Sequence, residues 1–382
     1  MKIAIDFVST CKIVDGIAKY TGGTNYAKQR INFLKEKCIS SGHTIILLVP
    51  NGFKASYKEK QLFDNLELVY VKDLTQTEYS RFNILYLPQV NGTTLLKIPS
   101  IKKKNKNLKI IATLHDRQHN ITKYDIYDRF YYSGLKRNLI ISYFYYIIKK
   151  ISFNTIYNYC IKFIDHIITV SNYSMQQLNN NAASIKYYLN NKLILMNNVL
   201  TERHNYCLFV GGNRPEKNLL RTLEAFCLFK KNYQSDTKMI VTGIDEDFRR
   251  MILKRKFINK DILDKNVYFV GYVSMNELAK LYAESKYVVF TSKGEGYGLP
   301  VKEALSYGKA VIASNITSIP EVAGAAAYYV NPFDVQSITK GFYYFENQSV
   351  LNHYELSAQK RYQILEKLSE LDDEEFFFDI FN

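Results

Sequence analysis

The stretch that most constrains the fold is residues 286–315, KYVVFTSKGEGYGLPVKEALSYGKAVIASN. It begins with a short run of β-branched and aromatic residues at 287–291, which is typical of a buried strand. The run ends at a loop with three glycines, and Pro300 then supplies the fixed φ that suits the first turn of a helix. Gly308 lies where a left-handed C-terminal cap would end that helix, and residues 310–314 resume a strand. The stretch therefore predicts one βαβ unit of a parallel sheet.

A βαβ unit of this kind predicts an anion site at the carboxyl edge of its sheet. Loop amides and the positive end of the helix dipole converge there, and phosphate is the anion that fits best. Two carboxylates, Glu295 in the loop and Glu303 in the helix, accompany that point and favour a ligand that also has hydroxyl groups. Two alternatives stay open: the acids only complement a helix terminus and a loop, or they form a glycosidase-like pair.

The length of 382 residues exceeds what one hydrophobic core supports, so two domains are expected. Strand-like runs alternate with helical segments on both sides of a polar stretch at 195–205, which we interpret as a linker. Strands are expected at residues 2–8, 43–49, 66–71, 83–87, 108–114 and 166–170, and then at 206–210, 239–242, 267–270, 287–291, 310–314 and 327–330. The predicted fold class is α/β, with two Rossmann-like domains and a ligand cleft between them.

The net charge of +15 is concentrated in one part of the chain. Residues 101–162 contain thirteen Lys or Arg and three Asp, a local excess of +10 (13 − 3) that favours contact with an anionic surface. The alternative is a solvated basic helix over an ordinary core. The longest apolar run, 139–148, is too short to cross a bilayer, and residues 1–10 indicate a first strand rather than a signal peptide. Five widely spaced cysteines favour a reducing cytoplasm.

A second phosphate-binding pattern is VGGNRPEKNLL at residues 210–220. Gly211 and Gly212 form a turn after a strand, and Arg214 and Lys217 stand at the entrance of the next helix. Cations in that place would share a phosphate with the free amides of the helix. A solvated turn with two surface charges is the alternative.

Two further segments end predicted strands. His115 follows the apolar run IIATL, where a histidine can donate to a sugar hydroxyl or to a developing negative charge, although a purely structural histidine is the alternative. Ser171 and Asn172 follow the run HIITV and are expected to cap a helix rather than to contact a ligand.

These motifs together resemble the retaining glycosyltransferases of family four. GEGYGLPVKEA is similar to that family's E-x7-E signature, and ALSYGKAVIASNITSIPEVAGAAAYYVNPFD continues the pattern. VGGNRPEKNLLRTLEAF resembles the family's phosphate-binding turn, while IIATLHD and DHIITVSNYS resemble its amino-domain blocks. The resemblance implies the GT-B architecture, with an acceptor-side domain at 1–197, a nucleotide-sugar domain at 205–355, and a C-terminal helix at about 360–382 that returns to the first domain.

The resemblance also implies roles for the residues of the E-x7-E segment. Glu303 would hold the ribose of the donor, and Glu295 would address the donor sugar. The loop amides that would address the sugar and diphosphate belong to Gly296, Tyr297, Gly298 and Leu299.

The remaining roles implied by the resemblance concern charge and the acceptor. Lys217 and Arg214 would neutralise the diphosphate, beside the turn of Gly211 and Gly212, and His115 would contact the transferred sugar near its reacting carbon. Gly22 and Gly23 would border the phosphate and the acceptor. Many relatives have arginine where this chain has Gly212, which makes Arg214 the candidate substitute.

The sequence therefore predicts a hexosyltransferase with no cofactor and no metal ion, cytoplasmic or peripheral on the inner face of the plasma membrane. Its predicted partners are a nucleotide-sugar donor, a glycan or lipid-linked acceptor and, through residues 101–162, an anionic membrane. The resemblance to mannosyltransferases of bacterial surface polysaccharides points toward GDP-mannose, with UDP-sugars as the alternative. The alternative hypothesis is a nucleotide-sugar epimerase or hydrolase of the same fold. A nucleic-acid binder would explain the charge but not the two glutamates, so no nucleic-acid partner is expected.

Overall fold

The computed structural model describes residues 1–14, 17–20, 24–56, 60–115, 123–131, 138–178 and 202–381. The described residues form two compact units. The first unit draws on Met1–Arg117, Ile151–Lys192 and Ser369–Asn382, and the second on Gln118–Lys150 and Leu193–Leu368. Most of the predicted linker lies outside the described residues. Residues 118–150, which the predicted boundary at 197 assigned to the first domain, are grouped with the second unit.

The first unit is built on a parallel six-stranded sheet with the order β5-β4-β1-β6-β7-β8. Its strands are β1 (Lys2–Asp6), β4 (Thr44–Pro50), β5 (Glu67–Val71), β6 (Ile84–Leu87), β7 (Lys109–Leu114) and β8 (His166–Thr169). The helices after them are α1 (Thr24–Ser40), α2 (Lys60–Phe63), α3 (Gly92–Lys104), α5 (Leu139–Cys160) and α6 (Asn172–Gln176). Only the part of α5 from Ile151 onward belongs to the first unit. The predicted cap of α6 is confirmed, because the Ser171 hydroxyl accepts a hydrogen bond from the amide of Ser174 at 3.0 Å.

The second unit repeats this strand order as β11-β10-β9-β12-β13-β14, again fully parallel. Its strands are β9 (Tyr206–Val210), β10 (Lys238–Thr242), β11 (Val267–Phe269), β12 (Tyr287–Phe290), β13 (Val311–Ser314) and β14 (Ala327–Val330). Its helices are α7 (Leu219–Asn232), α8 (Glu246–Leu253), α9 (Lys260–Asn266), α10 (Met275–Glu284), α11 (Leu299–Ser306), α12 (Ile319–Ala323) and α13 (Val335–Tyr344). The predicted α/β class with two Rossmann-like sheets is confirmed.

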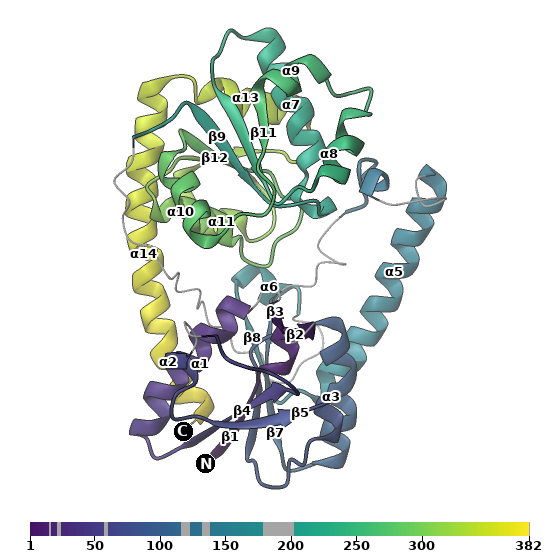
Figure 1. The fold of residues 1–382 in the computed structure, drawn as a ribbon, viewed down its shortest axis with the longest axis vertical. Helices are drawn as coiled ribbons and strands as arrows, with labels where there is room; N and C mark the ends of the chain where they lie inside the picture. The colour runs from purple at the N-terminus through teal and green to yellow at the C-terminus, as the bar shows by residue number, and fades with distance from the viewer. Residues whose placement is uncertain are drawn as a thin grey trace. The chain divides into compact units, whose positions relative to one another are not determined.

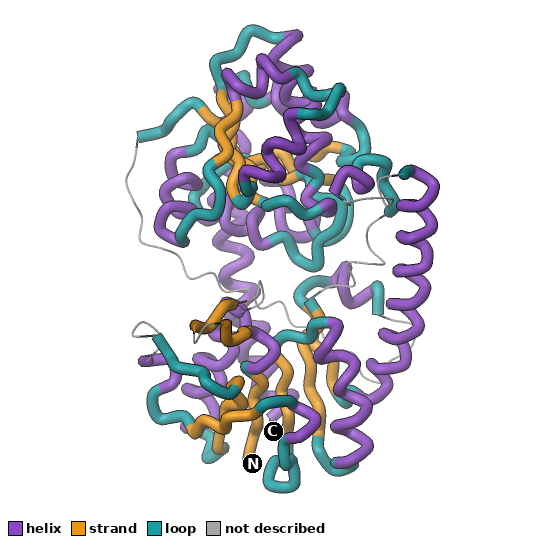
Figure 2. The backbone as a smooth tube through the Cα atoms, turned by 45° about the vertical axis from the view of Figure 1, so that its right-hand side comes forward, coloured by secondary structure: helices purple, strands orange, loops and turns teal. Residues whose placement is uncertain are grey.

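Helices cover both faces of the second sheet. Figure 1 shows α7, α9 and α13 on one side of its strands and α10 and α11 on the other. The α7 side forms one continuous core, in which Phe226 of α7 packs against Phe342 of α13 with ring centroids 5.3 Å apart. Because both faces are covered, β12 is buried along its whole length, as its uninterrupted apolar run predicted. Figure 2 shows the strands of each unit flanked by helices.

Three local features differ from the sequence-based expectation. The first strand ends at Asp6 rather than at residue 8, because the Asp6 carboxylate accepts hydrogen bonds from the amides of Val8 and Ser9 and so starts a turn. The antiparallel hairpin of β2 (Cys11–Val14) and β3 (Ile17–Tyr20) was not predicted. The last helix, α14 (Gln348–Phe381), begins well before residue 360, the start that the resemblance implied.

Helix α14 contributes to the cores of both units. Leu351 near its start is buried in the core of the second unit. Phe376 near its end is buried in the core of the first, where its ring lies 6.3 Å from that of Phe33. The residues 360–382 that the sequence assigned to the first domain thus include side chains that pack in the first unit.

Helix α5 is the other long helix, with 22 residues, and it is rich in apolar side chains. No helix in the described part of the chain has the length and hydropathy that crossing a membrane requires. The five cysteines are all buried, and none forms a disulfide.

Candidate active site

The candidate site lies at the carboxyl edge of the second sheet, where the loops after β9 and β12 meet. The two strands are paired in the centre of the sheet, so their following loops are neighbours. In open α/β sheets this edge is where ligands bind. The sequence motifs at 210–220 and 286–315 are thereby brought to one place.

The turn after β9 is built to bring Lys217 close to the strand. A Cβ atom on Gly211 would lie 3.0 Å from the Cβ of Lys217, so only glycine leaves room for that approach. A short 3₁₀ turn at Pro215–Lys217 follows, and Asn218 in the left-handed region (φ 65°) leads into α7. The side-chain amide of Asn218 donates to the carbonyls of Thr291 and Pro332 at 3.0 and 2.7 Å, which fixes this turn against the loop after β12.

The loop after β12 leads into α11 through Gly298. Gly298 has φ 102°, a conformation that side-chain-bearing residues rarely adopt, and it immediately precedes the helix. The hydroxyl of Ser318 donates to the carbonyls of Glu295 and Tyr297 at 3.1 and 2.9 Å and so stabilises the loop. Helix α11 has eight residues, and Gly308 follows it closely with φ 63°, in agreement with the predicted left-handed residue at the end of this helix.

Lys217 and Glu295, two of the predicted site residues, form an ion pair. The Lys217 Nζ lies 2.6 Å from the Glu295 Oε1, and both side chains are largely buried, with exposures of 7% and 13%. The Ser292 hydroxyl donates to the same carboxylate oxygen at 2.6 Å, and the ammonium of Lys217 lies 5.0 Å from the ring centroid of Phe290. A buried cation is therefore held at the sheet edge by partners on the neighbouring loop.

Glu303 lies in α11 with its carboxylate against a tyrosine. The Tyr282 hydroxyl donates to the Glu303 Oε2 at 2.7 Å. Burial raises the pKa of Glu303, while this hydrogen bond and the charge of Lys217 act in the opposite direction. The carboxylate is thus placed within the electrostatic reach of Lys217.

A cavity of about 350 Å³ opens beside these residues, within the second unit. Of the predicted residues, Gly211, Gly212, Arg214 and Lys217 line it. Its further lining residues are Val210, Asn213, Thr242, Gly243, Tyr272, Val273, Leu278 and Pro300. In the described part of the chain, the lining does not include Glu295, Glu303 or residues 296–299. The cavity is therefore lined by the turn after β9 and also by residues outside both motifs, such as Tyr272, Val273 and Leu278.

Tyr272, Val273 and Leu278 were missed by the sequence analysis. They follow β11 and begin α10, which places them at the same carboxyl edge as the two motifs. Tyr272 is 83% exposed, an unusual state for a large aromatic side chain. The signal that could have found it is its position just beyond a strand end.

Arg214 also lines this cavity and is more exposed than Lys217. Its guanidinium pairs with the Glu216 Oε1 at 3.3 Å, and its side chain is about half exposed. The two predicted cations are thus in different environments, one buried and one near the surface.

His115 belongs to the first unit, where it directly follows β7. Its Nε2 lies 3.1 Å from the carbonyl oxygen of Pro88, which can only accept, so the Nε2 carries the proton. Burial lowers the pKa of His115, which favours a neutral ring with an unprotonated Nδ1. The ring of Tyr26 stands edge-on to it, with centroids 4.7 Å apart. Gly22 and Gly23 lie outside the described residues.

Within the residues that the structure describes, no group of three or more His, Cys, Asp or Glu side chains could hold a metal ion. The charged groups at the sheet edge include the Lys217–Glu295 pair, Arg214 and Glu303. This set can bind an anion and hydroxyl groups with its own side chains.

Comparison with known proteins gives consistent matches. The family model described as "Glycosyl transferases group 1" matches residues 193–362. O-antigen chain mannosyltransferase RfbU of Salmonella typhimurium is 30% identical over 243 residues, which are 60% of this chain and 63% of that protein. O-antigen chain mannosyltransferase B of Escherichia coli is 33% identical over 137 residues, 35% of each chain. The chain thus spans less than two thirds of the length of these curated relatives.

Solved structures show the same fold over nearly the whole chain. Sucrose-phosphate synthase from Thermosynechococcus elongatus has a TM-score of 0.65 at 16% identity and covers 100% of this chain and 99% of its own. HepE from Anabaena, in complex with UDP and glucose, has a TM-score of 0.64 at 14% identity, with 98% and 99% covered. The family match thus covers residues 193–362, less than half of the chain, and the two Rossmann-like sheets agree with the fold of these solved structures.

Proposed function

We propose that this chain is a retaining glycosyltransferase that moves a hexose from a nucleotide-diphosphate sugar to a glycan or lipid-linked acceptor in cell-surface polysaccharide biosynthesis. The observation that carries the proposal is the buried Lys217–Glu295 pair beside a 350 Å³ cavity at the carboxyl edge of the second sheet. A cation, a glycine turn and the start of α11 converge there, a combination that suits a diphosphate.

In this proposal each group of the site has a distinct part. Lys217 neutralises the charge that develops on the diphosphate as the sugar leaves, and because it is already held in place it needs no reorganisation. Glu303 accepts from the ribose hydroxyls, and Glu295 from the hydroxyls of the sugar. The amides of residues 296–299 and of the Gly211–Gly212 turn add neutral donors to the diphosphate.

The transfer then needs no dedicated general base on the protein. The bond between the sugar's anomeric carbon and the diphosphate oxygen breaks, and the acceptor hydroxyl attacks from the same face, so the configuration is retained. The acceptor proton passes to an oxygen of the departing diphosphate. His115, with its neutral ring, would contact the sugar near the reacting carbon. No metal ion or cofactor takes part in this proposal.

The nucleobase is proposed to occupy the part of the cavity lined by Tyr272, Val273 and Leu278. An exposed aromatic ring and two apolar side chains offer a stacking surface for a flat base. The relatives named mannosyltransferases favour GDP-mannose as the donor, and the UDP bound to HepE keeps UDP-sugars as the alternative.

A panel of nucleotide-sugars tests this function. The melting temperature of the purified protein is measured with GDP-mannose, UDP-glucose, UDP-galactose or UDP-N-acetylglucosamine. Consumption of the donor that stabilises the protein is then followed with and without acceptor glycans. We expect one donor to raise the melting temperature and to be consumed only with acceptor, giving a product of retained anomeric configuration by NMR. Equal consumption without acceptor would favour the alternative, an epimerase or hydrolase, and no stabilisation by any donor would contradict the donor site.

We further propose that an anionic membrane holds the enzyme near a lipid-linked acceptor, on the cytoplasmic side. The support is an exposed apolar stripe on α5: Ile140, Phe144, Ile148 and Ile151 recur at helical spacing, each 59–65% exposed. Lys149 and Lys150 lie beside this stripe in the sequence. Apolar insertion combined with basic side chains is the pattern of helices that lie in a membrane interface.

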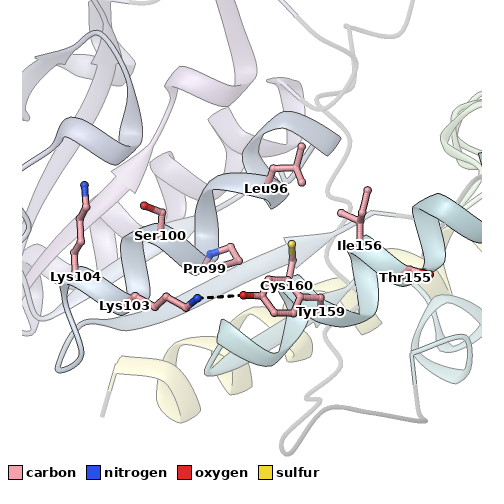
Figure 3. Close-up of a pocket in the computed structure, with 9 residues that line it drawn as sticks. All are labelled: Leu96, Pro99, Ser100, Lys103, Lys104, Thr155, Ile156, Tyr159 and Cys160. Carbon is pink, nitrogen blue, oxygen red and sulfur yellow. Dashed lines mark hydrogen bonds between the residues drawn. The ribbon is translucent and has the colours of Figure 1, made fainter.

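A groove of about 780 Å³ between α3 and α5 supports the same proposal. Figure 3 shows Leu96 and Ile156 toward one end of it and Lys103 and Lys104 toward the other. The Lys103 ammonium donates to the Tyr159 hydroxyl at 3.2 Å, and that hydroxyl lies within the groove. An acyl or isoprenoid chain with a phosphate head fits this arrangement of apolar walls and cations.

Vesicle co-sedimentation tests the membrane contact. Binding should rise with the fraction of anionic lipid, and Ile148→Glu should reduce it, whereas the matched variant Leu356→Glu, at an exposed site on α14, should bind like the wild type. Sedimentation that does not depend on anionic lipid would contradict the proposal.

A further inference from the structure

Residues 123–131, called the strap below, come from the first half of the sequence but pack on the second unit. The rings of Tyr127 and Phe130 lie 5.2 and 5.6 Å from that of Phe257, and the ring of Tyr131 lies 5.1 Å from that of Phe248. These aromatic side chains add to the core around α7, α8 and α9. The strap is therefore bound to the unit that holds the candidate active site.

A buried carboxylate, Asp125, anchors the strap. Its two oxygens accept from the two terminal nitrogens of Arg221 at 2.5 and 2.9 Å, a bidentate pair. The side chains are 2% and 6% exposed. The Arg221 guanidinium also lies 4.2 Å from the ring centroid of Tyr127, and it donates to the carbonyl of Pro332 at 3.2 Å.

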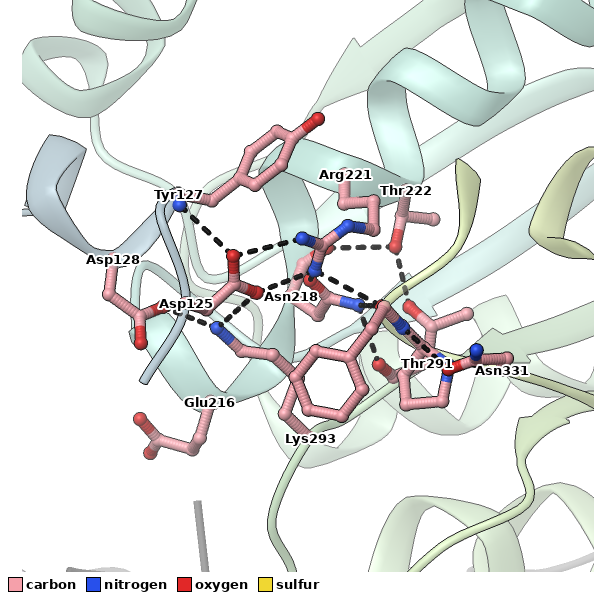
Figure 4. Close-up of polar contacts among 12 residues, drawn as sticks. Asp125, Tyr127, Asp128, Glu216, Asn218, Arg221, Thr222, Thr291, Lys293 and Asn331 are labelled. Atoms are coloured by element: carbon pink, nitrogen blue, oxygen red, sulfur yellow. Dashed lines mark hydrogen bonds and ion pairs between the residues drawn. The ribbon is translucent and has the colours of Figure 1, made fainter. Parts of the chain in front are cut away.

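The second contact of the strap is with Lys293, which lies two residues before Glu295. Figure 4 shows the Lys293 ammonium between the carboxylates of Asp125 and Asp128. It lies 3.0 Å from the Asp125 Oδ2, it also donates to the Asp128 Oδ1, and its side chain is 1% exposed. Through these ion pairs with Lys293, the strap is bound to the loop after β12.

The backbone around Lys293 leads directly to the Lys217–Glu295 pair. The Lys293 amide donates to the carbonyl of Glu216 at 2.7 Å, next to Lys217 in the sequence. The hydroxyl of Ser292 donates to the same carbonyl at 2.9 Å and to the Glu295 carboxylate at 2.6 Å. A displacement of Lys293 would thus move the groups that hold Glu295 and the turn before Lys217.

We propose that Asp125 and Asp128 of the strap are positioning residues, which act through Lys293 to hold the loop of Glu295 in the geometry that binds the donor diphosphate. The two carboxylates of the strap balance the charges of two buried cations, Lys293 and Arg221. The ion pairs of the strap described above are with Arg221 and Lys293, which do not line the cavity, so its effect on the donor would be transmitted by the loop. This inference rests on the proposed donor site.

The test compares two ways of weakening the strap. Asp128→Asn removes one partner of Lys293, and the double variant Lys293→Met with Asp128→Asn removes both charges and leaves the Asp125–Arg221 pair intact. Tyr127→Phe is the matched control, because it removes the hydrogen bond from the Tyr127 hydroxyl to Glu224 without touching Lys293. Binding of GDP and of UDP is measured by calorimetry at about 20 °C below the melting temperature of each protein, so that every variant is folded during the titration.

We expect the double variant to bind the preferred nucleoside diphosphate about tenfold more weakly, since misplacement of a binding group by a fraction of an ångström has effects of that order. Asp128→Asn should show a smaller loss, and Tyr127→Phe should lower the melting temperature but bind within about twofold of the wild type. The inference is overturned if the double variant binds as tightly as the wild type, or if Tyr127→Phe loses as much affinity. Failure of the wild type to bind either nucleotide would overturn the proposed function itself.

Discussion

The two sheets share one strand order, but the turns that follow their central first strands are chemically opposite. After β9 the chain continues with two glycines and then presents the buried ammonium of Lys217. The strand β1 ends instead in Asp6, a fully buried carboxylate whose Oδ2 has no hydrogen-bond partner among the described residues. Burial raises the pKa of Asp6 to about 6. The same topology thus produces one edge suited to a phosphate and one that disfavours an anion.

The difference between the two edges shows that the parallel sheet determines where a ligand site can lie, whereas the side chains determine the charge of that site. Both edges have strand ends and helix starts in equivalent places. In the second sheet the acids at the edge are paired with a cation or a tyrosine hydroxyl. In the first, the group after β7 is a histidine whose pKa is lowered by burial, which leaves it a neutral donor and acceptor.

The largest effect should come from removing the cation of the second edge. Lys217→Ala should lower kcat by a hundredfold or more, because loss of one preorganised charge-stabilising donor has cost about that much in other enzymes. Steady-state kinetics with the stabilising donor checks this. Lys231→Ala, an exposed lysine at the end of α7, is the matched control and should keep wild-type turnover. If Lys217→Ala transferred sugar at a near-normal rate, the buried cation would not be what makes the second edge suited to a diphosphate.

Asp6, the buried acid of the first edge, should make the stability of the protein depend on pH. The pKa of Asp6 is raised from 3.8 to about 6, so its protonated form is favoured in the folded state, and stability falls as the pH rises through 6. Asp6→Asn imitates the protonated form and should therefore be more stable than the wild type at pH 7.5, by up to about 3 kcal/mol, with little difference at pH 4. Thermal unfolding between pH 4 and 7.5 measures this.

Asp73 provides the control of opposite sign for that measurement. Its pKa is lowered to about 2, mainly by its hydrogen bond with Lys97, so its contribution to stability is present at neutral pH and is lost as the pH falls. Asp73→Asn should accordingly be less stable than the wild type at pH 7.5. A destabilising Asp6→Asn would show that the carboxylate of the first edge has a favourable partner after all.

A smaller effect is expected at Tyr272, on the side of the second edge that is proposed to bind the base. Tyr272→Ala should weaken nucleoside diphosphate binding about tenfold, since stacking of a base on an aromatic side chain is worth about 1–3 kcal/mol. Calorimetric titration with GDP and UDP gives the affinity. Tyr268→Ala, an exposed tyrosine on β11 that does not line the cavity, serves as the comparison. Equal losses in the two variants would show that stacking at Tyr272 is not the cause.

The smallest effect should come from Arg214. Its side chain is half exposed and already paired with Glu216, so Arg214→Ala should raise KM for the donor by about two- to fivefold, in the range of exposed ion pairs. Donor-dependent initial rates measure this. A loss as large as that of Lys217→Ala would mean that Arg214 turns into the site and acts as the second diphosphate cation.

Most of the sheet framework could be predicted because buried parallel strands leave a strong local pattern. Residues 206–210 and 327–330 were predicted with the observed bounds, since each is a short apolar run between breaks in the pattern. The motifs also placed Lys217 and Glu295 at one sheet edge. Their direct pairing was not predicted, because it depends on β12 lying beside β9 and on the Ser292 hydroxyl.

For other parts of the candidate site the local signal in the sequence was weak or absent. Tyr272 was missed because the chain contains 32 tyrosines, which made any single one uninformative. The strap was missed because the partners of Asp125 lie 96 and 168 residues further along the chain. No periodicity or capping pattern reports a pairing over such a distance.

The strap also has a consequence for how the protein is made. During synthesis Asp125 and Asp128 leave the ribosome well before Arg221 and Lys293, so the second unit is completed by a segment that must wait for its binding site. A fragment limited to residues 193–362, the range of the family match, would lack the strap and leave two buried cations without their carboxylates. Uncompensated buried charges cost about 3–5 kcal/mol each, enough to unfold many domains. We therefore expect that the range of the family match does not fold as a separate module, because part of the core of the second unit is encoded more than sixty residues upstream, at positions 123–131.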